Sequence, residues 1–246
     1  MKKEEIAITV KDLHVYYRDM KRFSLKKSGL KGKGSGKIFK AVKGVSFEVP
    51  KGQILGICGK NGSGKSTLLR AISGIFSADK GSINLHKNSI SLLSIGVGFQ
   101  KKLTGYENIY LSGMLLGYSK SEIDKKIDEI IEFSELGDFI YRPVSSYSSG
   151  MYSKLAFSIT AILETDIMLI DEVLSVGDIH FKEKSYNKMK ELISDSNRTV
   201  VIVSHSSKTI IELCDRVIWL HEGLIKADGD PEEIMTEYEE FMRAEA

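Results

Sequence analysis

One stretch decides how this chain folds: Gly59-Lys60-Asn61-Gly62-Ser63-Gly64-Lys65-Ser66-Thr67. It matches the pattern G-x-x-x-x-G-K-[S/T], follows the apolar run Ile54–Cys58 and leads into a predicted helix, Thr67–Ile72. A strand, a glycine-rich loop and a helix in this order form the context in which the pattern binds phosphate. The alternative, a chance glycine turn, does not require these flanking elements.

The residue types in this loop suit a nucleoside triphosphate. The glycines let successive backbone N–H groups turn toward the phosphates, and the helix N-terminus adds partial positive charge. Lys65 is placed to reach the β- and γ-phosphates, and the Ser66 hydroxyl to ligate Mg²⁺. A second glycine–lysine stretch, Gly32–Lys37, lacks the hydroxyl residue and a preceding apolar strand, so we predict a flexible loop there.

A second motif supplies the acids that an ATPase needs. Four apolar residues, Ile167–Ile170, predict a buried strand, and Asp171 and Glu172 follow at its carboxyl end, where α/β folds bind ligands. Asp171 is expected to hold Mg²⁺ through water, and Glu172 to polarise the attacking water as general base. Alone, an apolar run ending in two acids could equally be a helix cap. Together with the phosphate loop it predicts a catalytic site.

Three further polar elements narrow the class of protein. Tyr147–Met151 precedes a predicted helix, and its small residues can present backbone N–H groups and a hydroxyl to a phosphate. Gln100 and His205 each follow a predicted strand. Taken singly, a glutamine or a histidine at such a position is usually structural.

Composition sets the limits of these interpretations. The chain has 246 residues and a net charge of +2, so it carries no overall field that would attract nucleic acid. Its two cysteines, Cys58 and Cys214, form no disulfide framework or metal-binding spacing and suit a reducing compartment. No apolar stretch approaches the roughly 18 residues of a membrane span. We expect a chain that does not cross a membrane by itself.

The order of predicted elements indicates an α/β core interrupted by helices. Apolar runs and alternation predict strands at both ends of the chain, and helical periodicity dominates its middle. No internal repeat is present, so we expect one nucleotide cassette. The predicted strands are Ile6–Val10, Val42–Val49, Gln53–Cys58, Ser82–Leu85, Ile90–Leu93, Ile167–Ile170 and Thr199–Val203, and the predicted helices are 121–133, 151–163, 182–193, 208–214 and one beginning at Pro231.

These motifs, taken in chain order, resemble the ATPase subunits of ABC transporters over nearly the whole sequence. The resemblance implies an adenine-stacking Tyr17 (with Tyr16 as the alternative), an ATP-binding Walker A loop at Gly59–Thr67, and a Q-loop Gln100 that also serves the Mg²⁺ site. It implies a signature at Tyr147–Met151, in which Ser148 and Gly150 face phosphate. It further implies a Walker B acid Asp171, the catalytic Glu172, a D-loop at Ser175–Asp178 that contributes Asp178, and a switch His205. The family's usual signature is Leu-Ser-Gly-Gly-Gln, so Tyr147, Ser149 and Met151 depart from it.

Those departures are similar to the polysaccharide-exporting branch of the family, which moves teichoic acid, O-antigen or capsule chains on a lipid carrier. Ile95–Phe99 and Leu103–Leu111 carry the same resemblance. The composition, rich in lysine and poor in proline, favours wall teichoic acid. An ATPase for another cargo, such as a lipid or a drug, is the first alternative. A soluble ABC protein acting on ribosomes or DNA is the second.

The resemblance also implies an architecture and partners. We expect a P-loop NTPase of the RecA-like α/β type with an antiparallel β subdomain. Residues 1–100 and 163–246 would form the catalytic core, and residues 101–162 an inserted helical subdomain. Two copies would face head to tail with ATP and Mg²⁺ between them, at the cytoplasmic face of the plasma membrane. Two copies of a membrane-spanning permease would carry the lipid-linked polysaccharide.

The segment Arg18–Lys37 stands apart from the rest of the sequence. It holds eight lysines and arginines, four glycines and one acid, Asp19. Such a charge run is usually a solvated loop. The alternative is a cationic flap that touches anionic lipid headgroups or a lipid-linked diphosphate.

Overall fold

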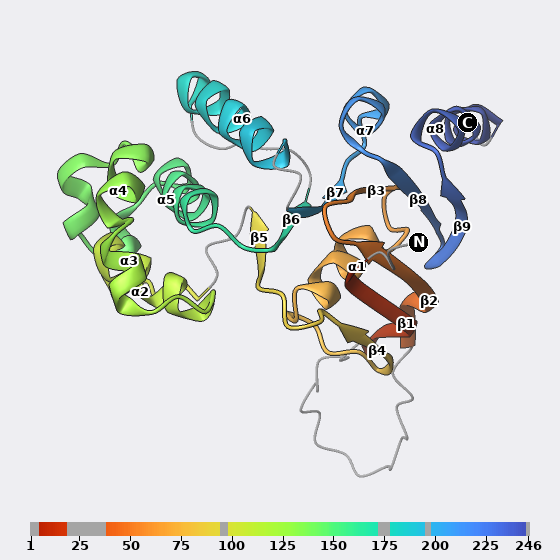
Figure 1. The fold of residues 1–246 in the computed structure, drawn as a ribbon, viewed down its shortest axis with the longest axis horizontal. Helices are drawn as coiled ribbons and strands as arrows, with labels where there is room; N and C mark the ends of the chain where they lie inside the picture. The colour runs from red at the N-terminus through yellow and green to blue at the C-terminus, as the bar shows by residue number, and fades with distance from the viewer. Residues whose placement is uncertain (1–4, 19–37, 94–97, 172–177, 195–197, 245–246) are drawn as a thin grey trace, which may run out of the picture.

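A computed structural model describes residues 5–18, 38–93, 98–171, 178–194 and 198–244. Nearly all of the basic segment, together with Glu172 and residues 175–177, lies outside the described residues. The ribbon has a sheet-rich end and a helical end (Figure 1).

The centre of the molecule is a sheet of six strands. Five of them run parallel, as expected for strands that are buried on both faces, and the last returns antiparallel as a hairpin. In spatial order they are β5 (Ile90–Leu93), β6 (Ile167–Asp171), β7 (Thr199–Val203), β3 (Ile54–Cys58), β8 (Arg216–His221) and β9 (Leu224–Gly229).

A second sheet is antiparallel and has three strands. Its long β1 (Ile6–Arg18) lies between β2 (Ile38–Pro50) and β4 (Lys80–Asn84). Helix α1 (Lys65–Ile72) contacts strands of both sheets and lies between them in Figure 1. The phosphate loop therefore leads into a helix that packs between the two sheets.

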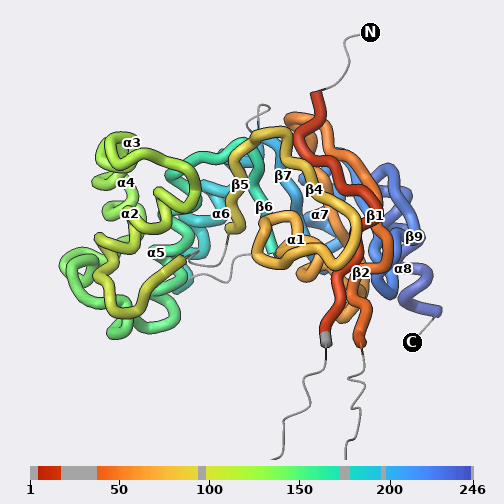
Figure 2. The backbone as a smooth tube through the Cα atoms, turned by 90° about the horizontal axis from the view of Figure 1, so that it is seen from below, coloured from red at the N-terminus to blue at the C-terminus, as the bar shows by residue number. Residues whose placement is uncertain are grey.

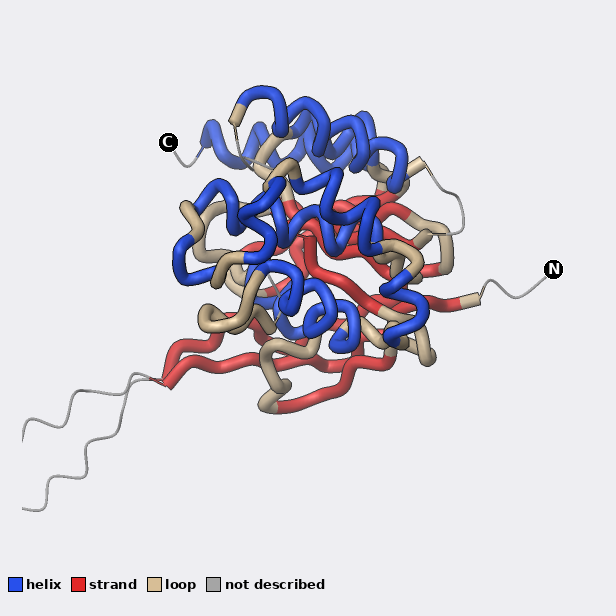
Figure 3. The backbone as a smooth tube through the Cα atoms, turned by 90° about the vertical axis from the view of Figure 1, so that its left-hand side faces the viewer, coloured by secondary structure: helices blue, strands red, loops and turns tan. Residues whose placement is uncertain are grey.

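Alternation along the parallel strands builds two separate cores. In β6, Ile167 and Leu169 join the core beneath α1, whereas Met168 and Ile170 join the core on the other face. That other face is covered by helices, and blue helices lie above the red strands in Figure 3. They are α5 (Ser149–Ile162), α6 (Ile179–Ile193), α7 (Ser207–Leu213) and α8 (Pro231–Ala244).

Between β5 and β6 the described chain forms helices, with a core of their own. Figure 2 shows this part gathered beside β5 and away from β1 and β2. Its elements are α2 (Gly105–Leu115), α3 (Lys120–Asp124), α4 (Ile127–Ser134), two 3₁₀ turns at Gly137–Tyr141 and Val144–Ser146, and α5.

The structure corrects several predicted elements. The single helix predicted over 121–133 is two helices with a turn at Lys125 and Lys126; Ile123, which lies close to Gly113, still faces the same core as Ile127 and Ile130. The first two strands extend to the edges of the basic segment. Helix α2 and the β8–β9 hairpin were not predicted. No helix in the described ranges combines the length and apolar character that spanning a bilayer requires.

Candidate functional site

Strand β3, the loop Gly59–Gly64 and helix α1 form the phosphate loop predicted from the sequence. Gly59, Gly62 and Gly64 have φ values of 143°, 81° and 107°, which non-glycine residues rarely adopt. A Cβ on Gly59 would lie 2.1 Å from the Leu220 carbonyl oxygen, and one on Gly64 would lie 2.4 Å from that of Ala41. The loop therefore needs these two glycines for space as well as for backbone conformation.

Two buried polar groups of this loop fit an anionic ligand. The Lys65 ammonium folds over the loop and donates hydrogen bonds to the carbonyl oxygens of Gly59 (2.7 Å) and Lys60 (3.0 Å). The Ser63 hydroxyl is buried, and within the described part of the chain it has no hydrogen-bond partner. A buried hydroxyl without a partner carries a desolvation cost that a bound phosphate oxygen would remove.

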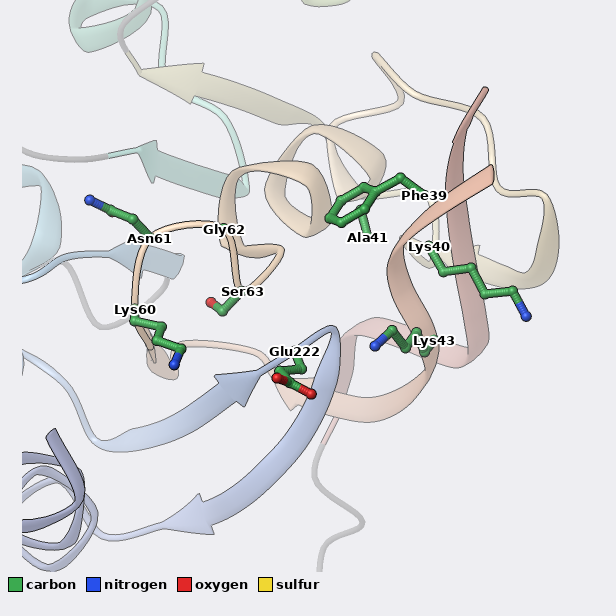
Figure 4. Close-up of a pocket in the computed structure, with 9 residues that line it drawn as sticks. All are labelled: Phe39, Lys40, Ala41, Lys43, Lys60, Asn61, Gly62, Ser63 and Glu222. Carbon is green, nitrogen blue, oxygen red and sulfur yellow. The ribbon is translucent and has the colours of Figure 1, made fainter. Parts of the chain in front are cut away.

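Two cavities lie along the loop. One, of about 270 Å³, is lined by Gly64, Lys65, Ser66 and Thr67 together with β2. The other, of about 380 Å³ and shown in Figure 4, is lined by Asn61 and Ser63 and by several charged side chains. Those charged side chains are Lys40, Lys43, Lys60 and Glu222, so lysines outnumber acids around the phosphate loop. This excess of positive charge favours the binding of a polyanion.

An aromatic side chain missed by the sequence analysis faces both cavities. Phe39 pairs with Tyr17 across β1 and β2, is 59% exposed and contributes to the lining of each cavity. In Figure 4 its ring points toward the phosphate loop. Its place opposite Tyr17 depends on the register of a hairpin, which local sequence does not specify.

Tyr17, the predicted adenine-stacking residue, lies beside the phosphate loop, and its side chain contacts neighbouring residues of the chain. Its hydroxyl is 3.0 Å from the Thr67 Oγ1, and its ring meets Phe76 edge-on. Tyr16, the alternative, hydrogen-bonds through its hydroxyl to His14. Because successive side chains of a strand point to opposite faces, Tyr17 and not Tyr16 lies on the side of the phosphate loop.

The structure brings Asp171 to the phosphate loop. The Ser66 hydroxyl donates to the Asp171 Oδ1 at 3.2 Å, although the two residues are far apart in sequence. A hydroxyl and a carboxylate oxygen are the ligand types that Mg²⁺ uses when phosphates supply the rest of its shell, so the pair fits this ion. Within the described ranges no cluster of three or more His, Cys, Asp or Glu residues could hold a metal alone.

Gln100 and His205 occupy the predicted type of position. His205 is exposed and follows β7, which lies between β3 and β6 in the sheet, so its backbone emerges at the same edge as Asp171. Gln100 is exposed, and its backbone is fixed by Asn108, a fully buried residue that the sequence analysis missed. Asn108 accepts from the Gln100 N–H at 2.7 Å and donates to the Gln100 carbonyl oxygen at 3.1 Å.

The predicted signature residues open helix α5. Ser148 is its N-cap, and the Ser148 hydroxyl accepts a hydrogen bond from the Met151 N–H at 3.2 Å. Among the described residues, a Cβ on Gly150 would meet only the Ser148 hydroxyl, at 3.8 Å, so their packing does not require glycine there. Figures 1 and 2 show β5 and β6 between α5 and α1, so the signature and the phosphate loop of one chain lie apart.

Asp178 lies beside α5. It caps α6 by accepting from the Phe181 N–H, and its carboxylate pairs with Lys154 at 2.8 Å.

Residues 42–175, more than half of the chain, match the sequence profile of the ABC transporter family. The chain belongs to that family. Its fold agrees, because the dimeric structure of the ATP-binding cassette MJ0796 with ADP and Pi aligns with a TM-score of 0.68 at 21% identity, over 91% of this chain and 98% of that one. The P-loop NTPase class with an α/β core, an antiparallel sheet and inserted helices is thus confirmed.

Several relatives of this ABC cassette are named as ATP-binding proteins of export systems. The teichoic acids export ATP-binding protein TagH of Lactococcus lactis is 48% identical over 84% of this chain and 44% of that protein. The O-antigen export system ATP-binding protein RfbB is 43% identical in Myxococcus xanthus, over 81% of this chain and 46% of that protein. In Klebsiella pneumoniae RfbB is 42% identical, over 84% of both chains. The chain spans about half the length of the first two relatives.

Proposed function

We propose that this chain binds and hydrolyses ATP as the nucleotide-binding subunit of an ABC exporter for a lipid-linked cell-surface polysaccharide. The observation that carries the proposal is the meeting of Ser66 and Asp171 at 3.2 Å beneath a glycine loop with a buried Lys65. Few chemistries other than nucleotide phosphate binding use this set of groups in this arrangement.

The residues of the proposed site have different roles in ATP hydrolysis. Lys65 and the loop N–H groups bind and orient the phosphates, and Ser66, Asp171 and Gln100 would hold Mg²⁺. The bound ion would supply neutralisation of the phosphate charge. Glu172 takes the proton of the attacking water as general base, and His205 holds the γ-phosphate. Tyr17 and Phe39 receive the adenine ring.

The complete site requires two chains. We propose a head-to-tail homodimer in which Ser148, Gly150 and Asp178 of one copy close over the nucleotide held by Gly59–Thr67 of the other. The open space at Gly150 and the separation of α5 from α1 support this arrangement. Nucleotide then joins the copies and hydrolysis releases them, which is a two-state element biased by the γ-phosphate.

The cargo proposal follows from the relatives. We propose wall teichoic acid as the polysaccharide, with O-antigen as the second candidate, because the TagH relatives are 43–48% identical to this chain and the two RfbB relatives 43% and 42%. Two permease copies would form the path, with this subunit peripheral at the cytoplasmic face of the membrane. Residues 101–162 would act as the helical subdomain that meets the permease, and residues 1–100 and 163–246 as the catalytic core.

Substitution of the general base tests the proposal directly. Glu172→Gln is expected to retain ATP binding and to slow turnover by about 10²-fold or more, the scale of lost general-base catalysis. Steady-state phosphate release and filter binding of ATP measure the two properties. Wild-type turnover in Glu172→Gln would overturn the assignment. The cargo is tested in proteoliposomes with the permease, where lipid-linked teichoic acid should stimulate ATPase activity more than lipid-linked O-antigen.

A further inference from the structure

Five titratable side chains meet where three helices of the structure come together. Lys154 of α5 lies between Glu135, which ends α4, and Asp178, which begins α6. Its ammonium is 3.1 Å from the Glu135 Oε2 and 2.8 Å from the Asp178 Oδ2. Lys184 and His180, both on α6, face the other oxygen of Glu135 at 3.0 Å and 3.5 Å. Lys154 is the member that reaches both acids.

The cluster rests on aromatic rings that hold the lysines in place. Phe133, Phe157 and Phe181 pack against one another with ring centroids 5.8 to 6.1 Å apart. The Lys154 ammonium lies 4.9 Å from the Phe181 ring, and the Lys154 side chain is only 13% exposed. Such a lysine has little room for other rotamers, so its ion pairs have a defined geometry.

The charges of the cluster stabilise one another. Burial alone would lower the pKa of Lys154, but hydrogen bonds to Asp178 and Glu135 outweigh it and raise that pKa. Burial likewise raises the pKa of Glu135, and hydrogen bonds from Lys184 and Lys154 reverse the effect. Lys154 and Glu135 therefore carry opposite charges at neutral pH.

The position of Lys154 gives the cluster a role beyond stability. Lys154 lies less than two helical turns after Ser148 and Gly150. Asp178 directly follows residues 172–177, which include Glu172. The Lys154–Asp178 pair is thus a direct link between the segment that faces the partner's nucleotide and the segment that follows the catalytic strand.

We propose that Lys154 is a positioning residue that couples the signature end of α5 to the start of α6 through its ion pair with Asp178. This inference rests on the proposed function. Without the pair, α5 and α6 of one chain would no longer present Ser148, Gly150 and Asp178 as one rigid surface. Closure over the partner's ATP would then bring these groups to the phosphates in the wrong relative position, although each chain would still bind ATP.

Lys154→Met tests this role, and Lys184→Met is its matched control. Lys184 also contacts Glu135 and lies over an aromatic ring, that of Phe133, but it does not pair with Asp178. Lys154→Met should lower kcat by roughly 10- to 100-fold, the scale of a small misplacement of positioned groups, with KM for ATP changed less than about twofold. Lys184→Met should keep kcat within about twofold while losing similar thermal stability.

One further variant keeps the test decisive if Lys154→Met folds poorly. Lys154→Arg retains the charge and should recover most of kcat. If Lys154→Met and Lys184→Met lower kcat equally, or if Lys154→Met matches an active wild type, the positioning role is wrong while the ATPase proposal stands. A wild type without ATPase activity would instead overturn the proposed function.

Discussion

At the scale of single residues, a second aromatic ring accompanies the predicted Tyr17 at the proposed adenine site. The Tyr17 hydroxyl lies 3.0 Å from the Thr67 Oγ1, and the Phe39 ring, whose centroid is 6.4 Å from that of Tyr17, lines both cavities. Every base has a π-face, and stacking on an aromatic side chain contributes about 1–3 kcal/mol per base. Phe39 should therefore supply much of the binding energy that distinguishes ATP from its phosphates alone.

Phe39→Ala is expected to weaken ATP binding by about 10-fold and to leave inorganic triphosphate binding unchanged, since only the base contact is lost. Tyr17→Phe, which removes the hydroxyl and keeps the ring, is the matched control and should bind both ligands normally. Calorimetry with the two ligands measures the difference. Equal weakening of ATP and triphosphate binding by Phe39→Ala would mean that the ring supports the loop instead of the base.

The sequence could predict the phosphate loop because its residues are contiguous. Asp171 could also be predicted, because the carboxyl ends of parallel strands meet at one edge of a sheet. Phe39 and Asn108 could not, since each acts through a partner that only the tertiary structure brings near. Conversely, once β1 is known to run beside the phosphate loop, the alternation of side chains along the strand shows that Tyr17, and not Tyr16, lies on the side of that loop.

At the scale of elements, Ser148 has two separable roles. It caps α5, and it is the proposed contact to the partner's nucleotide. Asparagine caps a helix about as well as serine, whereas alanine costs typically about 1 kcal/mol. The two roles can therefore be tested with different substitutions at one position.

Ser148→Ala should lower both thermal stability and ATP-dependent dimerisation. Ser148→Asn should lower dimerisation but keep thermal stability, because asparagine still caps α5 while the serine contact to nucleotide is lost. Ser119→Ala is the control, since it removes the capping box of α3 without touching the proposed site. Melting curves and size-exclusion chromatography with ATP measure these effects. Normal ATP-dependent dimerisation of Ser148→Asn would exclude the contact to nucleotide.

The α5–α6 ion pair predicts a specific dependence of stability on pH. A hydrogen bond from Lys154, supported by the Phe181 N–H, lowers the pKa of Asp178 from 3.8 to about 2. Because the pKa is lower in the folded state, the pair stabilises the fold above pH 4 and loses this effect as pH falls toward 2. The melting-temperature gap between wild type and Lys154→Met should thus be constant from pH 5 to 8 and shrink below about pH 4. A gap that stays unchanged down to pH 2 would mean that the Asp178 carboxylate does not contribute to it.

Elements were predicted where periodicity was strong and local. Strands β6 and β7 follow from their apolar runs, and α6 and α7 from their spacing. The β8–β9 hairpin was missed, although Glu222 and Gly223, both with positive φ, form the kind of tight turn that joins hairpin strands. The break between α3 and α4 falls at Lys125 and Lys126, where no glycine or proline marks it in the sequence.

At the scale of the whole molecule, the separation of α5 from α1 makes the head-to-tail dimer testable by crosslinking. Ser63 is buried within the loop, so the exposed Asn61 is the better position for a thiol on the Walker A side. The native cysteines do not interfere. Burial raises the pKa of Cys58 to about 12 and that of Cys214 to about 12, so their thiols stay protonated at neutral pH, and the thiolate is the reactive form.

Two differently tagged chains, one with Asn61→Cys and one with Ser148→Cys, are mixed in the Glu172→Gln background, which is expected to retain ATP. A short bifunctional maleimide should then yield a mixed dimer that carries both tags, only when ATP is present, because nucleotide brings the signature of one chain over the phosphate loop of the other. Replacing Ser148→Cys by Lys120→Cys, on exposed α3, should abolish the product. A doubly substituted chain that crosslinks within itself at any dilution, while the mixed chains never join, would place both halves of the site in one chain and remove the reason for the dimer.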